Sequence, residues 1–375
     1  MTDATVPDQA ETGPDQLDRL ARMFAHATEF DTSPLYTELA ATVADTPALL
    51  RLATLARPGQ YPTFAFFGAV QAVLLGGADH ELALFYRSAA GASPTSTSGA
   101  SPVPAPGVYA GAGPALIDFV AHHEDEISRL ISTRLVQTNI VKRSLALRIG
   151  LATITRTMNK PVHLIEVGAS AGIHLRFYRY GYHLGGRRFG EPDSPVQISA
   201  LWHSSAPVPD LDVLPPLAST TGIDLNPLNA ADPADRHWLE ALVFPENRHQ
   251  ADLLHHALDV VATDPPAIHR GDAIDLCPLL ARQLPPDEPR VVFHAVTRLH
   301  VPKDRRPAFD AAIDSLGEDA PLYRLSLELP PGPDPRPQPA RPGIALTLRE
   351  PDGRSTDLIV AEGRLEWVEP LAWSS

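Results

Sequence analysis

The residues best suited to chemistry form one run, His163-Leu-Ile-Glu166-Val-Gly168-Ala-Ser170-Ala-Gly172, in which an apolar segment ends in small residues. This pattern predicts a strand, a tight turn and a following helix over 171–180. Gly168 allows a sharp turn, and the small residues that follow let a ligand approach the backbone. Amides at the start of the helix would face the ligand, and Glu166 would accept hydrogen bonds from it. The run therefore predicts a nucleotide-binding turn.

The same run resembles the E/D-x-G-x-G-x-G pattern of S-adenosylmethionine (SAM) methyltransferases, whose acidic residue sits beside the methionine part of the cofactor. Glu166, Gly168 and Gly172 match the pattern, whereas Ser170 replaces the middle glycine. That replacement would narrow or alter the pocket. The resemblance implies that these four residues, with Ala169 between them, hold the methionine and ribose of SAM.

A second interpretation treats residues 168–172 as G-x-S-x-G, the nucleophile elbow of an α/β-hydrolase, with Ser170 as the nucleophile. A hydrolase also needs a later acid and then a histidine, and Asp272 followed by His294 or His300 has that order. Against this interpretation, the residues before Pro161 look helical, whereas hydrolases place several strands before the elbow. A purely structural tight turn is a third interpretation.

Acidic residues follow two later predicted strands. Asp224, with Asn226 beside it, is the candidate for the acid that holds the ribose hydroxyls in a dinucleotide fold. This assignment requires an insertion over 182–217, because the acid is expected about 20 residues after the turn, and a helix cap or an Asx-turn is the alternative. The pair Gly271-Asp272 comes after a further strand. In methyltransferases such a step often meets the adenine amino group, and a helix N-cap is the alternative here.

His294 ends the predicted strand Val291-Val-Phe-His294-Ala. The carboxyl ends of strands are where open α/β sheets bind ligands. Histidine titrates near neutral pH, so His294 would be the catalytic base or a hydrogen-bond partner that faces the methyl acceptor. A buried histidine with both ring nitrogens satisfied is the alternative.

The elements that must position these residues change in character at Pro161. Residues 15–160 show helical periodicity, interrupted by a low-complexity loop over 89–115. After Pro161, short apolar runs alternate with helical stretches, which predicts a mostly parallel sheet with helices on both faces. Near the chain end, a Glu-Pro-Asp-Gly turn over 350–353 predicts a closing antiparallel hairpin.

The sequence therefore predicts an α/β protein of two domains. Residues 1–160 would form an all-helical N-terminal domain with a disordered tail over 1–14. Residues 161–375 would form a Rossmann-like, SAM-methyltransferase-type domain.

Taken together, several motifs of the chain resemble the DUF2332 family, a bacterial and largely actinobacterial family of unassigned function. The matching segments are Ser-Pro-Leu-Tyr (33–36), Thr-Arg-Leu-Val-Gln-Thr-Asn (133–139), Glu-Val-Gly-Ala-Ser-Ala-Gly (166–172), Asp-Leu-Asn-Pro (224–227), Trp-Leu-Glu-Ala-Leu (238–242), Arg-Gly-Asp (270–272) and Phe-His (293–294). The resemblance spans nearly the whole chain and implies a methyltransferase-like Rossmann domain behind a helical domain.

Two positions depart from the family pattern, and both concern the substrate side. Ile140 stands where glutamate usually follows Gln-Thr-Asn, and His300 stands where an aromatic residue, often tyrosine, is usual. Arg134, Gln137 and Asn139 lie just before the Rossmann-like domain. They would either line the cleft over the cofactor or tie the two domains together, and Arg134 and Gln137 share one helical face by their spacing.

Composition narrows the function classes. With 45 acidic and 31 basic residues, the formal net charge is −14, which argues against nucleic acid or an anionic membrane as partner. The single cysteine, Cys277, excludes a disulfide framework, and the adjacent histidine pairs lack metal-ligand spacing, so no metal is expected. The polar, acidic start is unlike a signal peptide, which favours a cytoplasmic protein.

The leading hypothesis is methyl transfer from SAM to a small molecule. The alternatives are a serine hydrolase that uses Ser170 and a Rossmann-like protein that binds a ligand without chemistry. The methyl acceptor and the oligomeric state do not follow from the sequence.

Overall fold

The structure is a computed structural model, and it describes residues 14–91, 108–158, 160–329 and 343–371. The chain divides into two compact units. The helical unit comprises Met1–Thr138 and Pro233–Asp252, and the sheet unit comprises Asn139–Asp232 and Leu253–Ser375. Residues 1–13 of the expected tail and 92–107 of the expected loop lie outside the described residues. The remaining ends of that loop are helical in part, because 89–91 and 112–115 belong to helices.

All described elements that lie wholly within the helical unit are helices. They are α1 (Pro14–Ala25), η1 (Thr28–Phe30), α2 (Pro34–Ala44), α3 (Pro47–Ala53), α4 (Pro62–Leu75), α5 (Leu82–Gly91), α6 (Ala112–His122), α7 (Glu124–Thr133) and α9 (Pro233–Ala241). Residues near the first turn explain where several of these helices begin. Ser33 caps α2 by accepting a hydrogen bond from the Tyr36 amide at 3.2 Å, and proline occupies the first position of α2, α3 and α4.

The division of the chain differs from the single boundary expected near Lys160. Residues 233–252 belong with the N-terminal helices because their side chains are built into that core. Trp238 is 2% exposed and donates from Nε1 to the Leu135 carbonyl at 2.8 Å. Glu246, itself buried, accepts a hydrogen bond from the Ser33 hydroxyl at 2.8 Å.

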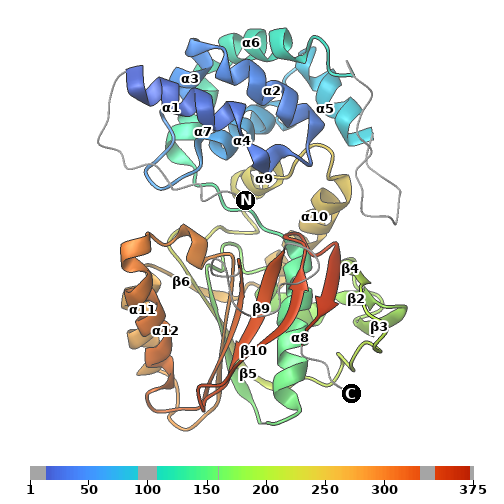
Figure 1. Cartoon of the computed structure of the whole chain (residues 1–375), viewed down its shortest axis with the longest axis vertical. Helices are drawn as coiled ribbons and strands as arrows, with labels where there is room; N and C mark the ends of the chain where they lie inside the picture. The colour runs from blue at the N-terminus through green and yellow to red at the C-terminus, as the bar shows by residue number, and fades with distance from the viewer. Residues whose placement is uncertain (1–13, 92–107, 159, 330–342, 372–375) are drawn as a thin grey trace. The chain divides into compact units, whose positions relative to one another are not determined.

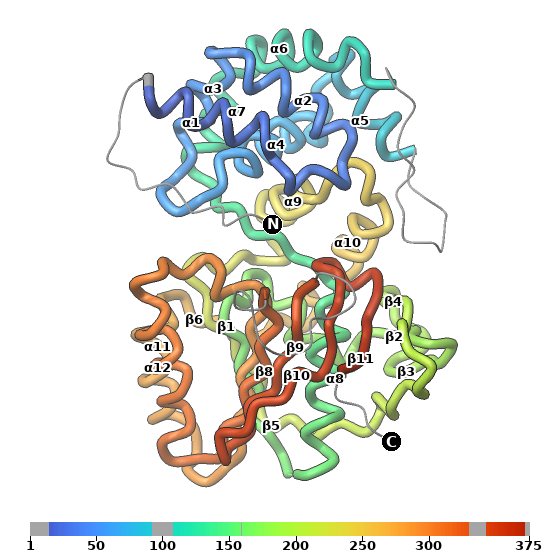
Figure 2. Tube along the Cα trace, viewed as in Figure 1, coloured from blue at the N-terminus to red at the C-terminus, as the bar shows by residue number. Residues whose placement is uncertain are grey.

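The sheet unit contains an 11-stranded sheet among the described residues, in the order β3-β2-β4-β11-β10-β9-β8-β7-β1-β5-β6. The strands are β1 (Val162–Val167), β2 (Gly181–Leu184), β3 (Arg187–Gly190), β4 (Gln197–Trp202), β5 (Leu217–Asp224), β6 (Ala267–Arg270), β7 (Arg290–Ala295), β8 (Leu322–Glu328), β9 (Ile344–Arg349), β10 (Ser355–Ala361) and β11 (Trp367–Pro370). Five strands that are neighbours in the sheet pair in parallel, in the order β8, β7, β1, β5 and β6. Strands β9, β10 and β11 continue the sheet antiparallel, and Figure 2 shows β2, β3 and β4 beyond them at one edge.

The remaining elements of the chain are helical. They are η2 (Val141–Arg143), α8 (Ser144–Thr155), η3 (His174–Arg179), α10 (Arg248–Thr263), α11 (Ala273–Ala281), η4 (Arg298–His300), η5 (Lys303–Arg305), α12 (Arg306–Asp314) and η6 (Ser315–Gly317). The division between the two units falls within α10. None of the described helices is long and apolar enough to cross a membrane.

Helices cover both faces of the sheet (Figure 1). Ile165 and Val167 of β1 and Val292 of β7 share a core with residues of α11 and α12. On the opposite face, Gly150 of α8 packs so closely on Leu325 of β8 that an added Cβ would lie 2.5 Å from a leucine carbon. The expected mixed α/β architecture with a large, mostly parallel sheet is therefore present.

Two local predictions need correction. The stretch after the turn at 168–172 was expected to be an α-helix over 171–180, but it is the short 3-10 helix η3, interrupted at Arg176 by φ −110° and ψ 16°. Tertiary hydrogen bonds override the helical pattern: the Tyr180 hydroxyl donates to the Ile173 carbonyl at 2.7 Å, and β2 begins at Gly181. Residues 136–143 lie within the stretch of expected helical periodicity but form no α-helix, and α8 begins only at Ser144, after η2.

Candidate functional site

The turn after β1 requires unusual backbone conformations. Gly168, Ser170 and Gly172 adopt φ values of +82°, +50° and +76°, in the left-handed region that favours glycine. A Cβ on Gly168 would lie 2.4 Å from Oγ1 of Thr297, and one on Gly172 would lie 2.4 Å from Cγ of Pro266. Both glycines are therefore required by conformation and by space, whereas Ser170 holds a strained conformation with a side chain.

Contacts from distant parts of the sequence hold Ser170 in place. Its amide donates to Oδ2 of Asp224 at 2.8 Å, and its hydroxyl oxygen accepts from Nδ2 of Asn139 at 2.9 Å. The other oxygen of Asp224 accepts from the amide of Asn226 at 2.7 Å, which is the Asx-turn alternative. The structure thus brings together three of the residues singled out in the sequence, Asn139, Ser170 and Asp224. The Asp224 carboxylate holds the turn at the end of β1.

Glu166, on β1, forms a buried pair with His174 of η3. Glu166 is 2% exposed, and its Oε1 lies 2.7 Å from Nδ1 of His174. The other ring nitrogen, Nε2, lies 3.1 Å from the Ile140 carbonyl oxygen. A carbonyl oxygen only accepts, so Nε2 must carry a proton.

The second oxygen of Glu166 is the exceptional atom of this region. Oε2 is enclosed and has no hydrogen-bond partner among the described residues. Burial raises the pKa of Glu166, and the neighbouring His174 opposes that shift. His174 lies two residues after the run 163–172 and was not predicted as a site residue. Its position just beyond the turn was the available signal, because a tight turn after β1 brings the first residue of η3 back to the strand.

Asp272 serves as the N-cap of α11. Its Oδ1 accepts from the Ile274 amide at 2.9 Å, and its Oδ2 lies 3.1 Å from Nη2 of Arg305. This is the N-cap alternative to adenine binding. The amide of Gly271 donates to the Asp224 carbonyl oxygen at 2.9 Å, so the ends of β5 and β6 are adjacent. The side chain of Asn226 accepts from Arg270 at 3.0 Å.

His294 is fully buried, and both of its ring nitrogens have protein partners. Nδ1 donates to Oε1 of Glu328 at 2.7 Å, and Nε2 accepts from Nε of Arg324 at 3.2 Å. The ring meets Phe309 of α12 edge-on, so it lies between the sheet and that helix. The structure therefore matches the buried-histidine alternative. It does not direct His294 toward an acceptor.

The remaining predicted residues are dispersed. Arg134 forms an ion pair with Asp235 at 2.6 Å within the helical unit, so it ties α9 to the end of α7. Gln137 also belongs to the helical unit, and His300 is an exposed residue of η4 in the sheet unit. The proposed hydrolase residues do not assemble either. Within the described part of the chain, no histidine is hydrogen-bonded to the Ser170 hydroxyl.

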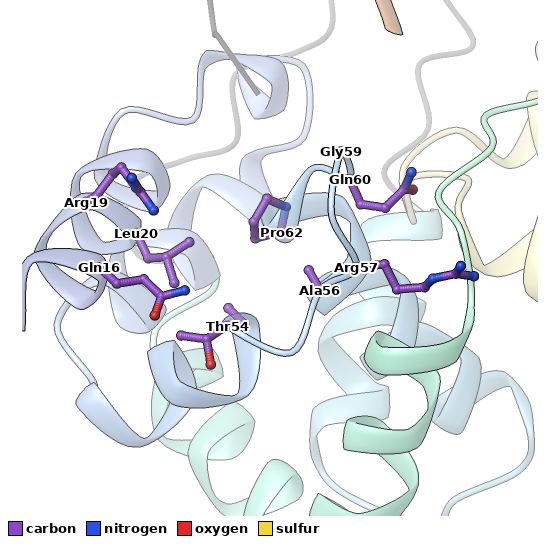
Figure 3. Close-up of a pocket in the computed structure, with 10 residues that line it drawn as sticks. Gln16, Arg19, Leu20, Thr54, Ala56, Arg57, Gly59, Gln60 and Pro62 are labelled. Carbon is purple, nitrogen blue, oxygen red and sulfur yellow. The ribbon is translucent and has the colours of Figure 1, made fainter. Parts of the chain in front are cut away.

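The helical unit also contains a pocket. Figure 3 shows its lining, which is Gln16, Arg19, Leu20, Ala53, Thr54, Ala56, Arg57, Gly59, Gln60 and Pro62. None of these residues had been singled out in the sequence. No cluster of three or more potential metal ligands occurs among the described residues.

Comparison with known proteins identifies the family of the chain. None of the curated proteins or solved structures compared with it matches significantly. One family model does match, described as an uncharacterized protein conserved in bacteria (DUF2332), and it covers residues 18–369. Because that match spans nearly all of the 375 residues, the chain belongs to the DUF2332 family.

Proposed function

We propose that the sheet unit binds SAM at the turn after β1 and transfers its methyl group to a small molecule. The topology supports this proposal. The parallel strands run in the order β6-β5-β1-β7-β8, so the chain order reverses at β1. In open α/β sheets of the Rossmann type, ligands bind outside the carboxyl ends of the strands at this reversal. Residues 168–172 lie there.

The unpartnered oxygen of Glu166 carries the proposal. A buried carboxylate oxygen without a donor is costly, and such atoms in native proteins call for an explanation. Glu166 lies two residues before the first glycine of the turn and is 2% exposed. The α-ammonium group of the methionine part of SAM would donate to Oε2. An ammonium at that oxygen favours the ionised form of Glu166. The proton between Oε1 of Glu166 and Nδ1 of His174 then stays on the histidine.

Other parts of the turn fit the cofactor unequally. Gly168 and Gly172 keep the backbone free of side chains, which suits a close approach. Each oxygen of Asp224 accepts a backbone amide, one from Ser170 and one from Asn226, so the carboxylate lies beside the turn, where the ribose hydroxyls would bind. Asp272 is committed to its helix and to Arg305, so we leave it out of the proposed site.

The proposed chemistry makes few demands on the protein. When bound, SAM supplies an electrophilic methyl group attached to sulfur. The protein must hold the cofactor and the acceptor in line, and positioning of this kind can supply much of a rate enhancement. The negative net charge of −14 favours a small-molecule acceptor over a nucleic acid.

Calorimetric titration of the full chain with SAM and with S-adenosylhomocysteine tests the proposal. We expect saturable binding that Glu166→Gln weakens about 10- to 100-fold, because a charged hydrogen bond is lost. Glu288→Gln is the matched control, since Glu288 pairs with His163 of the same strand at 2.7 Å but is half-exposed. Absence of binding of either compound at millimolar concentration would overturn the proposal.

One observation favours the hydrolase alternative, namely the left-handed φ of Ser170, which a nucleophile elbow also requires. Labelling with a fluorophosphonate probe tests it. Modification of Ser170 that is lost in Ser170→Ala would favour the hydrolase over methyl transfer, whereas an unlabelled protein would exclude an activated serine at this position.

A further inference from the structure

Buried arginines of the sheet unit divide into two kinds. Four of them have a carboxylate within 3.0 Å: Arg148 with Asp212, Arg176 with Asp264, Arg290 with Asp319 and Arg324 with Asp310. The fifth, Arg143 of η2, is 8% exposed and makes no ion pair within 4.0 Å among the described residues. Burying a charge without a counter-ion is strongly unfavourable. Arg143 is therefore the exception that requires a reason.

The guanidinium of Arg143 has hydrogen-bonding capacity left over. Nε and Nη2 both donate to a single acceptor, the Gly363 carbonyl oxygen, at 3.4 and 3.2 Å. Nη1 donates to none of the described residues, and it is not sealed away from solvent. Burial also lowers the pKa of Arg143 to about 10, and the attraction of Glu328 and Glu362 opposes that shift only in part. A ligand with an anionic group would supply the missing partner.

The nearby charges select the kind of anion. Glu328 and Glu362 lie within electrostatic range of Arg143. Neither carboxylate forms an ion pair with Arg143 within 4.0 Å among the described residues, and Oε1 of Glu328 accepts instead from the ring of His294 and from the amides of Thr297 and Arg298. Two carboxylates close by repel a doubly charged phosphate more than a singly charged carboxylate. A planar carboxylate also matches the fork of a guanidinium.

Arg143 is also connected to the proposed cofactor turn. Ile140, the N-cap residue of η2, is the residue whose carbonyl oxygen accepts from His174. Thr297, whose amide donates to Glu328, also packs against Gly168. We propose that Arg143 binds a carboxylate of the methyl acceptor, which makes the substrate a small carboxylic acid. That the bound acid is the methyl acceptor rests on the proposed methyl transfer, whereas the binding of a carboxylate by Arg143 does not.

Matched acids and amides test the site. Acetate, benzoate and glutarate are titrated against the full chain beside acetamide, benzamide and glutaramide, which have similar shapes without the charge. At least one acid should bind saturably and about 10- to 100-fold more tightly than its amide. Arg143→Met should abolish this preference, whereas Arg354→Met, at an exposed arginine paired with Glu350, should leave it unchanged. Failure of all three acids to bind, or a preference that survives Arg143→Met, overturns the proposal.

Repetition with S-adenosylhomocysteine separates this inference from the proposed function. An acid that binds beside S-adenosylhomocysteine supports an acceptor site. An acid that S-adenosylhomocysteine displaces belongs to the cofactor position and overturns the acceptor assignment. If S-adenosylhomocysteine does not bind but the acid does so through Arg143, the methyl transfer fails and the carboxylate site stands.

Unfolding provides a readout that does not depend on any ligand. Arg143→Met removes a buried charge that has no counter-ion, so its urea midpoint should stay the same or shift upward. Arg148→Met removes a buried charge that has one, so its midpoint should shift downward. A downward shift of equal size for both variants would show that Arg143 is a structural residue and contradict the proposal.

Discussion

Two histidine–glutamate pairs of the sheet unit, each with a buried histidine, have the same N–O distance but different surroundings. Nδ1 of His174 lies 2.7 Å from Glu166, and Nδ1 of His294 lies 2.7 Å from Glu328. In the first pair, the outer nitrogen meets a carbonyl oxygen and must be protonated. In the second, the outer nitrogen accepts from Arg324 and must be unprotonated. The outer ring nitrogen is therefore a donor in the first pair and an acceptor in the second.

This difference indicates which of the two pairs is suited to bind a ligand. Around Glu328, Oε1 accepts hydrogen bonds from the ring of His294 and from the backbone amides of Thr297 and Arg298. Around Glu166, one oxygen is enclosed and unused. A satisfied polar network stabilises a fold, whereas an unsatisfied buried group costs stability unless a ligand completes it. We therefore expect changes at the Glu328 pair to cost stability and changes at the Glu166 pair to cost binding.

The largest effect should come from Arg324→Met. Arg324 donates to His294 and forms an ion pair with Asp310 at 2.6 Å, so its loss leaves Nε2 of the buried His294 without that donor and Asp310 with Arg298 as its remaining arginine partner. We expect the free energy of unfolding to fall by about 3–5 kcal/mol. Urea unfolding followed by circular dichroism measures this. A loss smaller than that for Arg354→Met at the surface would contradict the structural role assigned to this pair.

Gly168→Ala should be next, because it acts where the two regions touch. A Cβ there requires the left-handed φ of +82° and meets Thr297 at 2.4 Å. We expect a loss of about 2–4 kcal/mol, of which about 1–2 kcal/mol comes from the backbone conformation. Adding Thr297→Ala should restore the steric part only, and urea unfolding of the single and double variants measures it. If the double variant gains nothing, the contact with Thr297 is not the cause.

Replacing each glutamate by glutamine compares the pairs directly. In Glu166→Gln, the new amide donates to Nδ1 of His174, which needs no proton of its own, so stability should change by less than about 1 kcal/mol. In Glu328→Gln, the charge beside His294 and Arg298 is lost, and stability should fall by about 1–3 kcal/mol. Parallel urea titrations decide between the pairs. Equal losses of stability would contradict the assignment of the Glu328 pair to stability and of the Glu166 pair to binding.

The smallest effect concerns Asp310, which completes the network around His294, and it depends on pH. Burial alone would raise the pKa of Asp310, but hydrogen bonds from Arg298 and Arg324 outweigh it and lower the pKa. A lowered carboxyl pKa stabilises the fold above about pH 4, and this contribution disappears as the pH falls through the folded-state pKa. Asp310→Asn should therefore lower the free energy of unfolding by about 1–2 kcal/mol at neutral pH. The loss is limited because the side chain of Asp310 is 31% exposed and solvent screens its charge. Urea midpoints across pH should converge in acid, and a gap that widens there would contradict the assignment.

Local patterns in the sequence were sufficient for the elements whose cause is local. The apolar run 162–167 coincides with β1, and the predicted hairpin at 350–353 joins β9 to β10. They were insufficient after Gly172, where a helical pattern yields η3. The tyrosine hydroxyl that bonds to Ile173 comes from the entry to the next strand, and periodicity does not register such a contact.

The candidate site shows the same limit. The sequence by itself determined the turn after β1, because only glycine tolerates the φ values and the close contacts at 168 and 172. The tertiary structure decided which carboxylates keep an oxygen without a hydrogen-bond donor. Asp272 and Glu328 meet donors, and one oxygen of Glu166 meets none. Likewise, only the fold shows that Arg143 lacks the carboxylate that other buried arginines have. The physical reason is that hydrogen-bond partners come from distant segments, so the charge left unbalanced at a site is a property of packing.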